Sequence, residues 1–198
     1  MTAGCFGWRG FDVPILTFLI AVAAKIAKSM QMKSNCIPRL GILAFLLFSP
    51  SVAQAACTDP PEQGVDWKRC IFDGQDLNGV DLQEAHLRDA SFYRAELVES
   101  NLSSSDAFRA KFVNAVMTAV RFDAAKLSEA DFTKADLTSA SFVGSDLRRA
   151  RLYSANLRGA DFSNARLQGA DLSKADLSGA TWTSGDKICA EGSIGRCN

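Results

Sequence analysis

The sequence predicts an all-β solenoid, a chain that winds into stacked coils, and two observations carry this prediction. Counting by fives from Phe72 to Trp182 gives 23 positions without an insertion, and 20 of them are Leu or Phe. The position two residues before each of these is mostly small, and it is Ala in 16 of the 23. A period of five fits neither the turn of a helix, about 3.6 residues, nor the alternation of a strand. The chain must therefore turn regularly, with both periodic positions facing inward, as in a solenoid.

The repeated unit is complete in several places. Ala130-Asp131-Phe132-Thr133-Lys134 and Ala170-Asp171-Leu172-Ser173-Lys174 both read as Ala, Asp, a large apolar residue and two variable residues. This pattern resembles the pentapeptide repeat family over residues 70–182. The resemblance implies a right-handed quadrilateral β-helix of about 23 repeats, four to a coil, over residues 72–182. It also implies a core filled with Leu, Phe and Ala side chains, which leaves no internal room for a substrate.

The first 55 residues are typical of an export signal. Lys33 and Arg39 precede an apolar run over residues 40–48, and the A-x-A motif Ala53-Gln54-Ala55 follows it. A leader of this length is too long for a signal peptide, so we interpret the sequence before Met30 or Met32 as an extension ahead of the true start. We expect cleavage near Ala55 and a periplasmic or secreted protein. Lipid attachment at Cys57 is not expected, because Gln54 stands where a lipobox needs an aliphatic residue.

Each end of the solenoid needs a cover, since an open coil edge invites pairing with another chain. We expect an amino-terminal cap over residues 56–71 and a carboxyl-terminal cap over residues 183–198. An even number of cysteines in an exported protein predicts disulfides, and four cysteines allow three pairings. The short separations favour Cys57–Cys70 and Cys189–Cys197. A four-thiolate zinc site is the alternative, but the C-x-x-C spacing that usually marks one is missing from these cysteines.

Charge separates the predicted faces of the coil. The net charge of zero argues against a strongly basic nucleic-acid-binding protein. With four repeats to a coil, residues 20 apart share a face, and two adjoining faces carry a net charge of +2 each, against −4 and −3 for the other two. Such a coil is suited to an anionic envelope surface or to a partner of complementary charge. The candidate interaction face consists of Arg88, Arg109, Lys126, Arg148, Arg149 and Arg166.

The pattern is irregular at residues 105–120. Ala107 occupies a position of the large apolar residue, and its neighbour Phe108 is predicted to point outward. In one interpretation the coil bulges so that Phe108 fills the space over Ala107, because burying a Phe side chain contributes roughly 2–3 kcal/mol. In the other, an apolar patch is exposed as a partner site. Its residues are Val98, Phe108, Val113 and Val116.

No catalytic, metal-binding or cofactor-binding motif stands out. The chain has a single histidine, His86, and most of its Asp residues occupy the Asp position of the repeat. The sequence thus predicts a non-catalytic exported solenoid that binds an unknown protein or envelope partner, without a cofactor or a small-molecule substrate. A homodimer through one end of the solenoid is a further expectation. The alternative is a cytoplasmic DNA mimic that protects DNA gyrase, as some family members do, but the leader, the cysteine pairs and the basic faces disfavour it.

Overall fold

The computed structural model describes residues 57–198. The leader, the extension before Met30 or Met32 and the cleavage position near Ala55 lie outside the described residues and stay predictions.

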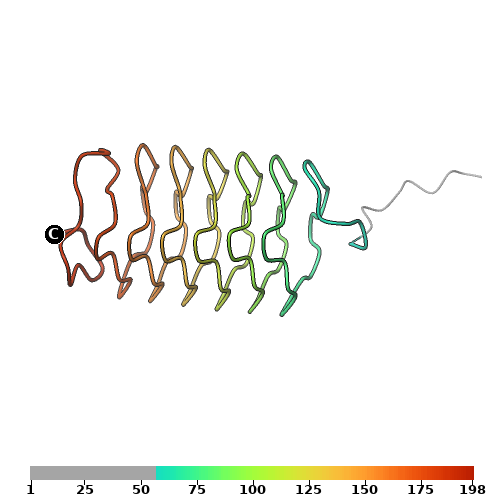
Figure 1. The fold of residues 1–198 in the computed structure, drawn as a ribbon, viewed down its shortest axis with the longest axis horizontal. Helices are drawn as coiled ribbons and strands as arrows, with labels where there is room; N and C mark the ends of the chain where they lie inside the picture. Colours follow the sequence, from blue (N-terminus) through green and yellow to red (C-terminus); the bar gives the residue numbers. More distant parts are fainter. Residues whose placement is uncertain (1–56) are drawn as a thin grey trace, which may run out of the picture. The chain divides into compact units, whose positions relative to one another are not determined.

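The chain forms a solenoid β-helix with 20 residues in each coil. Parallel bridges join residue pairs 20 apart, from Asp66 with His86 to Asp161 with Thr181. Figure 1 shows the result as a row of stacked loops. Within residues 57–198 every bridge is a single residue long, and there is no α-helix. None of the residues described here therefore belongs to a helix long and apolar enough to cross a membrane.

A tight turn explains why the repeat has five residues. In the repeat of Leu87, the backbone N–H of Ala90 donates to the carbonyl of Leu87 at 3.1 Å, and Asp89 has a φ of 59° between them. Among residues 57–198, seventeen non-glycine residues have a positive φ, and all of them occupy this place in a turn. Such a φ is uncommon outside glycine. Here it is held by pairing to the next coil, since Asp89 N–H also donates to the carbonyl of Phe108 at 3.0 Å.

The inside of the coil is filled by stacked side chains. Phe92, Phe112 and Phe132 lie above one another with ring centroids 5.0 Å apart and nearly parallel planes. A second stack runs through Phe142 and Phe162, whose centroids are 5.1 Å apart. The Ala residues between them are at most 1% exposed over most of the length. This close packing leaves the outer surface as the place for binding.

The coil does not bulge at residues 105–120, contrary to one interpretation of the sequence. His86, Asp106 and Lys126 are bridged in register, and Ala107 is fully buried. The pairing of the backbone fixes this path, so the smaller side chain changes the core locally without shifting the chain.

The expected apolar patch is also wrong as a single surface. The 20-residue register places Val98 and Val116 on one face of the coil, Phe108 on a second and Val113 on a third. Of these side chains Val116 is 39% exposed, and the other three are half-buried. The four residues are close in sequence, but the turns between them point their side chains in different directions.

Both ends carry a disulfide-linked cap. Cys57 is joined to Cys70, and Cys189 to Cys197, which are the pairings expected from the sequence. At the amino-terminal end Trp67 packs on Phe72 with ring centroids 4.1 Å apart.

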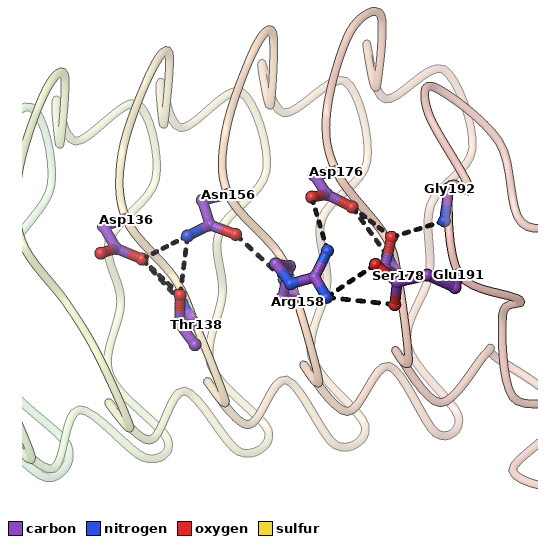
Figure 2. Close-up of polar contacts among 8 residues, drawn as sticks. All are labelled: Asp136, Thr138, Asn156, Arg158, Asp176, Ser178, Glu191 and Gly192. Carbon is purple, nitrogen blue, oxygen red and sulfur yellow. Dashed lines mark hydrogen bonds and ion pairs between the residues drawn. The ribbon is translucent and has the colours of Figure 1, made fainter.

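At the other end the chain turns back on the last coil. Ile188 and Ile194 form antiparallel bridges with Thr181 and Asp176. Figure 2 shows that Arg158 donates to both Asp176 and Glu191, and that the backbone N–H of Gly192 donates to Ser178 Oγ. These contacts attach the cap to one part of the last coil.

Candidate functional site

A hollow of about 550 Å³ lies on the face whose inward residues are Leu87, Ala107, Leu127 and Leu147. We call this hollow the basic groove. Its cationic lining is Arg88, Lys126, Arg148 and Arg149, and the other lining residues are Asp106, Phe108, Ser128, Glu129, Asp146 and Gln168.

The structure brings together most of the interaction face expected from the sequence. Four of its six cations line the basic groove. Arg109 lines a neighbouring hollow of about 410 Å³, together with Lys111 and Arg151 of the adjoining basic face. Arg166 lies further along the same face as the groove and lines neither hollow.

Phe108 belongs to this site, although the sequence reasoning separated it from the cations. Its ring lies 4.9 Å from the guanidinium carbon of Arg88 and 4.9 Å from that of Arg109. A guanidinium over an aromatic face is attracted by the ring quadrupole. Two features of the sequence point to this contact. Phe108 follows Arg88 by 20 residues, one full coil, and Arg109 comes directly after Phe108.

Ion pairs neutralise part of the cationic charge. Four acids on this face each have an arginine partner within 4 Å. The pairs are Arg88–Asp106 at 3.4 Å, Arg109–Asp89 at 2.8 Å, Arg148–Asp146 at 2.6 Å and Arg149–Glu129 at 3.5 Å. Among residues 57–198, Lys126 and Arg166 have no acidic partner within that distance. The face therefore keeps two unpaired cations.

The paired acids are held in their charged form. Side-chain hydrogen bonds from Arg148 lower the pKa of Asp146 to about 2, against the opposing effect of partial burial. Side-chain hydrogen bonds from Arg109 lower the pKa of Asp89 in the same way. Both carboxylates therefore remain ionised at neutral pH.

The acidic side of the coil is organised differently. Asn156 Nδ2 donates to Asp136 Oδ1 at 3.1 Å and to Thr138 Oγ1 at 2.8 Å, and Asp136 Oδ1 also accepts from the hydroxyl of Thr138 (Figure 2). These polar groups form hydrogen bonds with one another. The basic groove, by contrast, contains the half-buried ring of Phe108 and an exposed, unpaired lysine, Lys126.

The arrangement is suited to binding. Within residues 57–198, no cluster of three or more His, Cys, Asp or Glu side chains could hold a metal ion. The groove presents positively charged donors and one aromatic surface on a coil whose interior is filled. Anionic groups, above all carboxylates and phosphates, are the ligands that such donors recognise.

The repeat seen in the coil agrees with known protein families. The family model described as "Pentapeptide repeat region" matches residues 115–185. The model described as "Pentapeptide repeats (8 copies)" matches residues 63–92, 76–112 and 85–122. The chain belongs to the pentapeptide repeat family.

Several solved pentapeptide repeat proteins are similar to this chain. HetL from the cyanobacterium Nostoc sp. strain PCC 7120, described as involved in heterocyst differentiation regulation, has 28% identity over 65% of this chain and 66% of its own, with a TM-score of 0.48. QnrB1, described as a plasmid-mediated fluoroquinolone resistance protein, has 26% identity over 60% of this chain and 62% of its own, with a TM-score of 0.45. The chain thus spans slightly less than two thirds of the length of either protein. No curated protein sequence matches the chain.

Proposed function

We propose that this pentapeptide repeat protein is an exported, non-catalytic binding protein that holds an anionic partner on the basic groove. The observation that carries the proposal is the placement of Phe108 and the unpaired Lys126 in one hollow on the outside of a filled coil. The signal-like leader supports export. The two disulfides support it as well, because such bonds persist in oxidising compartments.

The chemistry of the groove favours an anionic partner. The side chains of Arg88 and Arg149 are 47% and 78% exposed, so their remaining donors reach solvent although each has an acidic neighbour. Such partly paired cations exchange partners at little cost, since exposed ion pairs contribute only about 0–1 kcal/mol. A DNA mimic would instead need an acidic surface at this place.

Vesicle binding tests the proposal directly. We expect the oxidised protein to sediment with vesicles that contain phosphatidylglycerol at low salt, but not with vesicles of phosphatidylcholine alone. Added salt should release it, because screening weakens exposed charge interactions. Polyglutamate serves as a second probe, and binding to it without vesicle binding would assign an acidic protein partner.

Two matched variants locate the binding surface. Lys126→Gln removes one charge from the groove, and Arg121→Gln removes one charge from the acidic side, where Arg121 pairs with Asp123. We expect the first variant to bind several-fold more weakly and the second to bind as the unchanged protein does. Failure to bind either anionic probe, or equal loss in both variants, would overturn the assignment of the groove.

A further inference from the structure

A row of unpaired cations runs along the basic face that adjoins the groove. Arg94, Lys134 and Lys174 occupy the same place in three turns, two coils apart, and all three are exposed. We call these three residues the cation ladder. Asn114 and Ser154 fill the same place in the coils between them. Among residues 57–198, no member of the ladder has an acidic partner within 4 Å.

The pairing of the backbone fixes the spacing of this row. Arg94 N–H donates to the carbonyl of Val113 at 3.0 Å, and Lys134 N–H donates to the carbonyl of Tyr153 at 2.9 Å. The φ of each ladder residue lies between 56° and 61°, so the three side chains leave the coil in the same direction. The coils are stacked in a row (Figure 1). Neighbouring coils paired in this way lie about 4.8 Å apart, so successive cations of the ladder are about 9.6 Å apart.

A tyrosine lies beside the cation at each end of the ladder. The guanidinium carbon of Arg94 is 4.9 Å from the centre of the Tyr93 ring, and Lys174 Nζ is 5.3 Å from the centre of the Tyr153 ring. Such a contact contributes about 0.5–1 kcal/mol at an exposed site. It restrains the cation without neutralising its charge. The two outer charges of the ladder are therefore placed, and each has an aromatic surface next to it.

The acids of this face have other partners. They are Asp73, Asp131 and Asp171. Asp131 pairs with Arg151 at 3.5 Å, and Asp73 accepts from the hydroxyl of Ser91 at 2.6 Å. Asp171 accepts from a backbone N–H at 3.0 Å. None of the three forms an ion pair with the ladder, so the ladder is open to an anion from outside the chain.

The spacing of the ladder distinguishes between classes of anionic ligand. In a polyproline II segment every third side chain points to the same side, and three residues rise about 9.3 Å. Over the two steps of the ladder the mismatch is about 0.6 Å, which side chains can absorb. In a β-strand the same-side repeat is about 6.8 Å. An α-helix returns to the same side after seven residues, about 10.5 Å, and fits less well. The phosphates of a duplex strand are much closer together, about 3.4 Å along the axis.

We propose that the cation ladder binds an acidic, proline-rich segment of a partner protein, in the polyproline II conformation and with an acid at every third residue. The carboxylates meet the three cations in turn. The rings of Tyr93 and Tyr153 offer the kind of aromatic surface on which proline-rich segments dock. This surface lies on a different face from the basic groove, and the proposal does not depend on what the groove binds.

Peptide binding to the oxidised protein at low salt tests the proposal, with fluorescence anisotropy as the measurement. The probe is a labelled peptide of five Pro-Pro-Glu triplets, and we expect saturable binding that weakens as salt is added. The matched control is an isomer of the same composition whose glutamates are alternately two and four residues apart. It should bind several-fold more weakly, because only every second glutamate then faces the ladder. Equal binding of the two peptides, or binding of neither, would overturn the proposal.

Three variants of the protein locate the binding surface. Lys134→Gln removes the central charge of the ladder and should weaken binding of the Pro-Pro-Glu peptide several-fold. Lys126→Gln in the basic groove and Arg121→Gln on the acidic side should bind this peptide as the unchanged protein does. If Lys126→Gln lost as much affinity as Lys134→Gln, the peptide would belong to the groove and the ladder would be wrongly assigned. Tighter binding to a carboxylated polysaccharide than to the peptide would likewise contradict the proposed partner.

Discussion

The small residue of each repeat is needed because two side chains per repeat share a narrow interior. Ala130 and Ala135 lie on either side of Phe132 in sequence, and all three are at most 1% exposed. The ring of Phe132 already has Phe112 at 5.0 Å and Phe122 at 5.7 Å. No space remains for a longer side chain at the Ala position, which explains why the sequence holds Ala there so regularly.

Enlarging one such residue tests this packing. We expect Ala130→Leu to lower the free energy of unfolding by about 1–3 kcal/mol, the usual cost of overfilling a packed core. Chemical denaturation measures the change. Lys134→Leu adds a comparable apolar side chain at an exposed position of the same repeat and should have little effect. Equal destabilisation by both variants would contradict the account of the core.

The paired carboxylates predict how stability depends on pH. The pKa of Asp146 is lowered to about 2, so its contribution is complete above the pKa of an unfolded Asp, about 3.9, and is lost as the pH falls toward 2. The melting temperature should be nearly constant from pH 7 to 5 and should fall below pH 4. In Asp146→Asn the fall between pH 4 and 2 should be shallower. An unchanged slope would show that this pair contributes nothing to stability.

The sequence identifies the charged residues of the candidate site but not their contacts. Lys126, Arg148 and Arg149 could be assigned to one face because the 20-residue register decides which way a side chain points. The position of Phe108 between two guanidinium groups depends on side-chain conformations in two coils. The five-residue repeat contains no information about those conformations. The sequence alone therefore suggests a bulge or an apolar patch at Phe108, and not its contact with the two arginines.

At the scale of the structural element, the caps are less predictable from the sequence than the repeats are. The cysteine spacing predicts the loop that Cys189 and Cys197 close. The return of the chain along the last coil, with antiparallel bridges at Ile188 and Ile194, has no periodic signal. It forms because the covered part of the last coil offers unpaired backbone groups and the loop is short enough to reach them.

Removing the second disulfide tests the role of the carboxyl-terminal cap. In Cys189→Ser with Cys197→Ser, we expect unfolding free energy to fall by roughly 2–3 kcal/mol, the chain-entropy value for a short loop. Amide exchange should accelerate first at Leu177 and Trp182, whose N–H groups donate to the cap. Since each coil contacts only its neighbours, exchange near Phe92 should change little. Uniform acceleration along the chain would contradict this local role.

At the scale of the whole molecule, the fold was predictable because one short pattern repeats through most of the chain. Each coil pairs with the next in the same way, from Asp66 with His86 onward, so the repeat alone implies stacking. Function was less predictable, since a filled coil acts through its outer surface. Position in the cell decides which partners that surface meets. The residues of the predicted export signal precede the described part of the chain.

The most direct test of the account is the intact mass of the protein isolated from its host, with and without reduction, followed by alkylation. We predict a chain that has lost the residues up to Ala55 and that takes up four alkyl groups only after reduction, one at each cysteine of the two disulfides. This result would establish that the protein is exported and oxidised. A chain that keeps its leader in the cytoplasm, with its thiols free to react before reduction, would contradict the account.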